Sequence, residues 1–238
     1  MTTYEPNRLD LLAEAVIPTA TTPRQLLDAG VHWLLHEDTA ELWLSRPGRV
    51  DGTSRLTMLA GGFAAHHASA VLRCSGYEPR VECGHRFDRS EPLAILRRGD
   101  PRPMDWSLYR AIYRSGTPTR LRVVPSSMIE QLREAARGCD AVAHPLPGRS
   151  PHPSPGESPG VERLVLCARA NRPDAWFATG QALSQLRIRA ALAGFSAQIA
   201  ELLPDRRRFG KDFTADEQDV PAATLRIVAA SRSHAAGD

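Results

Sequence analysis

One stretch, residues 54–75, constrains the fold more than any other part of the sequence, because a long helical repeat there contains two adjacent glycines. Five side chains recur at the spacing of a helix that buries one face: Leu56, Leu59, Phe63, His67 and Ala70. Gly61 and Gly62 lie inside this repeat and cost about 1 kcal/mol each relative to alanine. Such a cost is tolerated where another backbone or a flat ligand approaches closely, and tight packing is the more frequent reason.

A second long helix is predicted over residues 174–193, with Trp176 and Leu186 among its inward side chains. Gly76 and Gly194 follow the two long helices, and glycine favours the left-handed conformation that often ends a helix. Between the two helices lies a segment rich in proline and glycine, residues 145–160, which has no apolar pattern and predicts a flexible loop.

The remaining elements are shorter. Helices are expected at 8–18, from Thr22 onward, at 92–98, 106–114, 127–136 and 197–203. Strands are expected at 40–44, 77–83, 140–144, 161–170 and 224–229. Asp105 is a candidate cap for the helix at 106, and Ser127 with Glu130 has the spacing of a capping box.

Length and composition favour one globular domain spanning residues 1–238, with 42% hydrophobic and 24% charged residues. Cys74, Cys83, Cys139 and Cys167 are scattered, which favours free thiols in a reducing compartment over a disulfide framework. No signal peptide or membrane span is visible, so a cytoplasmic location is expected. A net charge of +3 is too small to indicate a nucleic-acid partner.

The sequence carries none of the specific motifs for a P-loop, a dinucleotide-binding turn, a nucleophile elbow or a zinc protease. His32 and His36 have the spacing of one helical face, but no carboxylate or cysteine is delivered to it, so no metal site is predicted. Cys83 and His85 also lack an orienting partner. An arginine cluster, Arg206, Arg207 and Arg208, follows a predicted helix and is a candidate phosphate site or a solvated charge run.

Three segments taken in order resemble the FMN-dependent nitroreductase superfamily, and its actinobacterial Acg-type branch in particular. Residues 172–198 resemble the family's D-x-x-x-W-x-x-x-G-x-A-L helix through Asp174, Trp176, Gly180, Ala182, Leu183 and Gly194. Residues 59–83 are similar to a helix and strand of that branch, and residues 108–136 lie where the family has an arginine motif followed by a capped helix.

This resemblance implies an α+β, three-layer fold with a central, mainly antiparallel sheet flanked by helices. Family members are dimers or fused pseudo-dimers that bind FMN between their two halves. They pass hydride from NAD(P)H to small-molecule acceptors, so the partners expected here are NAD(P)H, an acceptor, and a second subunit in a homodimer or heterodimer. The protein's part in such chemistry is to bind and orient the cofactor.

The resemblance also suggests residues for the FMN site. Arg114, Thr117 and Arg120 stand near the family's arginine motif, and the 206–208 cluster is a further candidate for the phosphate. The backbone at Gly61 and Gly62 is the candidate contact for the flavin ring. The sequence identifies no catalytic residue.

Several family positions differ in this chain, and the differences leave an alternative open. Residues 16–25 lie near the expected place of the family's A-P-S-x-x-N-x-Q-P-W loop and keep none of its polar side chains. Two lost charge-assisted contacts would weaken FMN binding by about 3–6 kcal/mol, or about 10²–10⁴-fold. The alternative is a catalytically degenerate protein on the same scaffold, which sequesters flavin or serves as a cofactor-free partner subunit.

Overall fold

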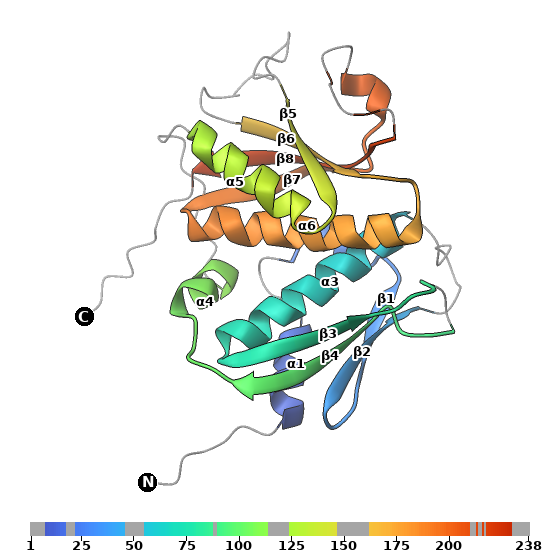
Figure 1. Ribbon diagram of the computed structural model, residues 1–238, viewed down its shortest axis with the longest axis vertical. Helices are drawn as coiled ribbons and strands as arrows, with labels where there is room; N and C mark the ends of the chain where they lie inside the picture. The colour runs from blue at the N-terminus through green and yellow to red at the C-terminus, as the bar shows by residue number, and fades with distance from the viewer. Residues whose placement is uncertain are drawn as a thin grey trace, which may run out of the picture.

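The protein is a mixed α+β structure with two antiparallel four-stranded sheets (Figure 1). The computed structural model describes residues 8–17, 22–45, 55–87, 90–113, 124–146, 162–209, 213, 216 and 218–229. Within these residues no helix is both long enough and apolar enough to cross a bilayer.

The first half of the described chain runs from α1 to β4. Its elements are α1 (Arg8–Val16), α2 (Arg24–Leu27), β1 (Val31–Leu35), β2 (Thr39–Leu44), α3 (Arg55–Cys74), β3 (Tyr77–Cys83) and β4 (Ala94–Pro101). The strands form a sheet in the order β1-β2-β4-β3, and every pair is antiparallel.

The second half runs from α4 to β8. Its elements are α4 (Trp106–Tyr113), α5 (Ser126–Arg137), β5 (Ala141–Leu146), β6 (Glu162–Ala168), α6 (Pro173–Leu192), β7 (Phe195–Leu202), the short 3₁₀ helix η1 (Arg206–Phe209) and β8 (Val220–Ala229). The sheet order is β5-β6-β8-β7, again with antiparallel pairs.

The two halves repeat one topology. Each has two helices, two strands, a 20-residue helix and two more strands, and the strand orders match position by position. No repeat is evident in the sequence. In the structure, His66 and Ser184 occupy equivalent places in α3 and α6, 118 residues apart, and they contact each other. The halves are therefore related by a pseudo-two-fold axis that passes through the contact between these helices.

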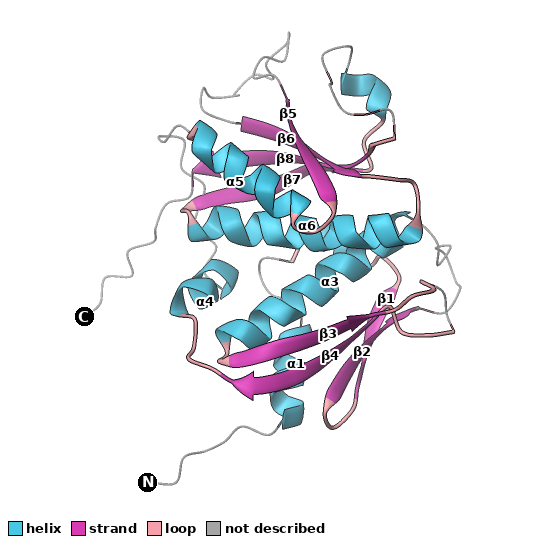
Figure 2. Ribbon diagram, in the orientation of Figure 1, coloured by secondary structure: helices cyan, strands magenta, loops and turns pink. Residues whose placement is uncertain are grey.

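Helices α3 and α6 cross between the two sheets, each resting on the sheet of its own half (Figure 2). The α+β class and the antiparallel pairing are thus as predicted. The expected single central sheet is wrong for the described chain, because the helices form the middle and the sheets lie outside them. Each sheet therefore has one face on its helix, which explains the alternating burial along β2.

The interior joins the halves. One hydrophobic cluster contains side chains from both long helices and both sheets, among them Leu42, Leu59, Trp176, Leu186 and Leu225. Burial of a large apolar side chain stabilises a fold by about 1.5–3 kcal/mol. Separating the halves would expose many such side chains at once.

Two predicted helices are strands. Residues 92–98 contribute to β4, where Ala94 and Leu96 are buried and Arg97 is exposed. Residues 197–203 contribute to β7, where Phe195 and Ala197 face inward. Both segments are short, and pairing with β2 and β3 for β4, and with β8 for β7, outweighs the weak helical preference of residues such as leucine and arginine.

Of the residues predicted to start helices, one is confirmed as a cap and the others are not. Asp105 caps α4 as predicted, since its Oδ1 accepts a hydrogen bond from the Leu108 amide at 2.9 Å. The capping box of Ser127 and Glu130 is wrong, because α5 begins one residue earlier and Pro125 precedes it without a side-chain cap. The helix expected from Thr22 ends at Leu27, and β1 follows it.

Candidate functional site

The contact between the two long helices is made by glycine. A Cβ atom at Gly62 would overlap the Phe177 carbonyl oxygen and lie 3.0 Å from the Gln181 amide nitrogen. A Cβ atom at Gly180 would overlap the Leu59 carbonyl oxygen and lie 2.8 Å from the Phe63 nitrogen. Gly62 and Gly180 are each the eighth residue of their helix, so the same close backbone contact is made once from each half.

The neighbouring glycine is enclosed as well. A Cβ atom at Gly61 would lie 2.9 Å from Leu93 Cδ1 and 3.5 Å from the Phe177 ring. The close approach at Gly62 is therefore made by α6, whereas Gly61 is covered by Leu93, just before β4, and by the Phe177 ring of α6. No flat ligand fits against their backbone in this arrangement, so the ring contact proposed for these two residues is not formed here.

Two histidines follow the glycines along α3: His66 is half-buried and His67 is buried. His66 Nδ1 lies 3.0 Å from Ser184 Oγ, directly across the pseudo-two-fold axis. Burial lowers the pKa of His66 to about 4, and a hydrogen bond that the imidazole makes with the Gln185 side chain raises it in part. Burial, with smaller contributions from His66 and Arg187, likewise lowers the pKa of His67 to about 4. Both imidazoles are uncharged at neutral pH.

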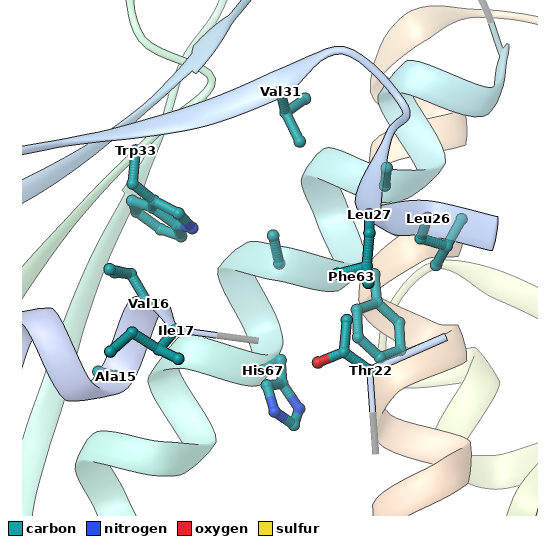
Figure 3. A pocket seen from close by; sticks show the side chains of 12 residues that line it. Ala15, Val16, Ile17, Thr22, Leu26, Leu27, Val31, Trp33, Phe63 and His67 are labelled. Carbon is teal, nitrogen blue, oxygen red and sulfur yellow. The ribbon is translucent and has the colours of Figure 1, made fainter. Parts of the chain in front are cut away.

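A recess opens beside His67 in the first half (Figure 3). Its volume is about 100 Å³, and its walls come from the end of α1, from α2, from β1 and from α3. Trp33 of β1 lies on one side, with Phe63 of α3 across from it. The Phe63 and His67 rings stack with their centroids 5.6 Å apart and their planes 16° from parallel.

The recess is apolar except at two places. Its described lining contains Thr22 and His67 as polar side chains and no charged side chain. Ile17 and Leu27 form part of the rim and are 59% and 43% exposed. A space with aromatic walls and an uncharged imidazole suits a neutral apolar group better than an ion, because a buried charge needs a partner.

The arginine cluster serves the local structure. Arg206 Nη1 donates to the carbonyl oxygens of Asp216 at 2.9 Å and Asp219 at 2.8 Å. Arg208 pairs with Glu201 at 2.7 Å. Arg207 is exposed, and its backbone amide donates to Asp205. The three side chains therefore do not converge on one phosphate-sized point, and Arg206 holds the connection between β7 and β8.

Arg114, Thr117 and Arg120 lie outside the described residues, as do most of the proline-rich residues 145–160. The FMN site predicted at the first three residues and the flexible loop predicted at 145–160 therefore stay predictions. The helix expected after the arginine motif is present as α5.

The sequence did not predict a contact in the second half between a half-buried histidine and a buried aspartate. His144 Nε2 of β5 lies 3.2 Å from Asp219 Oδ2, just before β8, and the Phe213 ring meets the imidazole edge-on at 5.5 Å. No sequence signal joins residues this far apart. Burial raises the pKa of the nearby Cys167 to about 12, with a smaller effect from Asp219, so that thiol stays protonated and is no nucleophile.

The other candidate residues that the structure describes do not come together in a catalytic or metal site. His32 and His36 lie on and just after β1 rather than on a helix; His32 contacts Ser45, and His36 lies 3.5 Å from Glu41. Burial raises the pKa of Cys83. All four cysteines are free thiols, as predicted. Among the described residues no group of three or more His, Cys, Asp or Glu is placed to hold a metal.

These observations bear on FMN. Pockets for ligands of that size usually hold about 300–1,000 Å³. The recess is several times smaller, the Gly61–Gly62 backbone is covered by α6, and the 206–208 arginines contact their own segment. The recess, the Gly61–Gly62 backbone and the 206–208 cluster therefore do not form an FMN site, and the site predicted at Arg114, Thr117 and Arg120 lies outside the described residues.

The sequence matches no protein-family model, and no curated protein matches it.

Proposed function

We propose that this chain is a binding protein on a fused, pseudo-dimeric scaffold of nitroreductase type, and that it does not run a flavin redox cycle. The observation that carries this proposal is the glycine crossing, in which Gly62 and Gly180 bring α3 and α6 into backbone contact. That contact occupies the space assigned to a flavin ring from the sequence.

The repeated topology supports the scaffold. Two of the three segments that resemble the family, residues 59–83 and 172–198, fall on α3 with β3 and on α6 with β7, which are equivalent elements of the two halves. A fused pseudo-dimer has this form, because one chain supplies both sides of an interface that two subunits otherwise share. A scaffold of this form would supply both sides of the interface without a second subunit.

Absorbance tests the proposal directly. The protein is purified without added cofactor and its spectrum recorded between about 350 and 500 nm, then again after incubation with FMN and gel filtration. We expect no flavin bands in either spectrum. Flavin bands that survive filtration, together with NAD(P)H oxidation by the protein alone, would contradict the proposal.

A flavin-dependent oxidoreductase is the second candidate. It is favoured by one observation: α5 follows residues 114–123 in the same order as the family's helix follows its arginine motif. If flavin is retained, the variants Arg114→Ala and Arg120→Ala decide whether those residues hold the phosphate. Undiminished flavin in both variants would remove them from the site.

A further inference from the structure

The recess beside His67 has the form of a ligand site. It is deepest at α3, where Ala60, Phe63 and His67 are buried, and it reaches the surface at Ile17 and Leu27. Figure 3 shows Trp33 and Phe63 on opposite sides of the space, with His67 below them. An open-mouthed recess of this kind admits a molecule without any rearrangement of the core.

The chemistry of the walls restricts the ligand. Ten of the twelve described lining residues are apolar, and two of these are aromatic rings able to stack or meet a ligand ring edge-on. No described lining side chain is charged. An anionic or cationic ligand would lose its hydration without gaining a counter-ion, whereas a neutral ring loses little on entry.

The size of the recess restricts the ligand further. An engineered cavity of about 150 Å³ in another protein holds one benzene molecule. The recess here is about 100 Å³, and its open mouth leaves room for a substituent to project past Ile17 and Leu27. The recess is therefore on the scale of one six-membered ring and too small for a fused three-ring system.

From this geometry we propose that the recess binds a neutral molecule with a single aromatic ring, held between Trp33 and Phe63 with its substituent directed to the rim. This names the ligand class for the binding role proposed above and rests on that role. Among the described residues the second half does not repeat these two rings, because Gln181 and Gln185 stand at the α6 positions equivalent to Phe63 and His67.

Three probes of one shape and different charge test the proposal: benzyl alcohol, benzoate and benzylamine. Binding is followed through the indole N–H signals of the four tryptophans in a ¹H–¹⁵N spectrum. We expect benzyl alcohol to shift the Trp33 signal until the site is saturated. The signal of Trp43 should not shift, because this residue is on the neighbouring strand and its indole N–H donates a hydrogen bond to Glu41. Benzoate and benzylamine should bind at least tenfold more weakly.

Variants that fill the recess provide a second test of the proposal. Ala64→Leu places a larger side chain into the space from α3 and should weaken benzyl alcohol binding at least tenfold. Ala135→Leu is the matched control, because Ala135 is also a partly buried alanine packed against the main core but does not line the recess. If Ala64→Leu loses its dispersed spectrum, Val31→Phe fills the recess from the edge strand instead.

Four results would overturn the inference: no Trp33 shift with benzyl alcohol, equal shifts at all four indoles, equal binding of the three probes, or unchanged binding by both filled variants. FMN that stays bound after gel filtration would contradict the proposed function. The titration of the Trp33 signal would still test the ligand site by itself. The failures of the two proposals are therefore distinguishable.

Discussion

The first and second halves of the molecule use the same backbone positions and place different side chains beside them. Gly62 and Gly180 make equivalent contacts, and Gly76 and Gly194 end the two long helices with φ of 89° and 81°. One helical turn from these contacts the sequences diverge, since His67 in α3 corresponds to Gln185 in α6.

This difference separates scaffold from site. Positions where two backbones meet, or where φ is positive, accept only glycine at low cost, so both halves have the same residue there. Positions that line open space are under no such restriction. In the first half they form an aromatic recess, and in the second half glutamine occupies the equivalent places on the helix.

The largest effect is expected where the halves touch. Gly62→Ala and Gly180→Ala should each lower the free energy of unfolding by about 3 kcal/mol or more, because each added Cβ meets a backbone carbonyl that cannot move alone. Urea denaturation measures this. The double variant should fall short of the sum, because both changes open one contact.

The control for this prediction is Gly138→Ala at the end of α5. Gly138 has φ of −62°, and an added Cβ would lie 3.6 Å from the nearest carbonyl oxygens. The free energy of unfolding of the Gly138→Ala variant should differ from that of the unmodified chain by less than about 0.5 kcal/mol, or be slightly higher. A loss at Gly62 no larger than at Gly138 would show that the helices do not cross as described.

The histidines of α3 make the first half sensitive to acid. In the unfolded chain they take up protons near pH 6.5, whereas in the fold the pKa values of His66 and His67 are lowered to about 4. Stability is therefore complete above about pH 6.5 and falls toward pH 4, by about 1.4 kcal/mol per pH unit for each histidine.

Substitution at the equivalent position tests the origin of this pH dependence. His67→Gln introduces the side chain that the second half has at Gln185, and it should remove about half of the slope between pH 6.5 and 4. Thermal or urea unfolding at several pH values measures it. An unchanged slope would mean that His67 is not held in its uncharged form by the fold.

The helix ends offer a smaller comparison. Gly194→Ala should cost about 1–2 kcal/mol, because the only penalty there is the positive φ and no atom lies within 4 Å of the added Cβ. Gly76→Ala should cost more, since its Cβ would also lie 3.0 Å from the Arg102 carbonyl oxygen. Equal losses in urea denaturation would contradict this difference.

The smallest effects belong to the arginine cluster. Arg206→Ala removes two hydrogen bonds to backbone carbonyls and should lower stability by about 1 kcal/mol. Arg207→Ala, at an exposed side chain, should change it by less than about 0.5 kcal/mol. A large loss of FMN or phosphate binding in Arg207→Ala would restore the cluster as a ligand site.

Sequence patterns predicted the elements that have strong local signals. The two long helices, their glycine ends, the Asp105 cap and strands at 77–83 and 161–170 agree with α3, α6, β3 and β6. The signals failed in short segments such as β4 and β7, where pairing with strands distant in the chain decides the structure. The number and placement of the sheets depend on the same long-range pairing.

The candidate site was less predictable than the fold. The glycine pair in α3 indicated a close approach, but the sequence does not identify the approaching partner, which is α6. The recess requires α1, α2, β1 and α3 together, and a helix was expected where β1 begins. His144 and Asp219 are joined only when β5 and the start of β8 are brought together through β6.

The most direct test is a calorimetric titration of the unmodified chain with benzyl alcohol, with FMN titrated in parallel. We predict one benzyl alcohol site per chain and no FMN binding, because the described residues of the second half do not repeat the aromatic recess and the helix crossing covers the Gly61–Gly62 backbone. Two equivalent sites per chain, or tight FMN binding with no benzyl alcohol site, would contradict the division into a symmetric scaffold and a one-sided site.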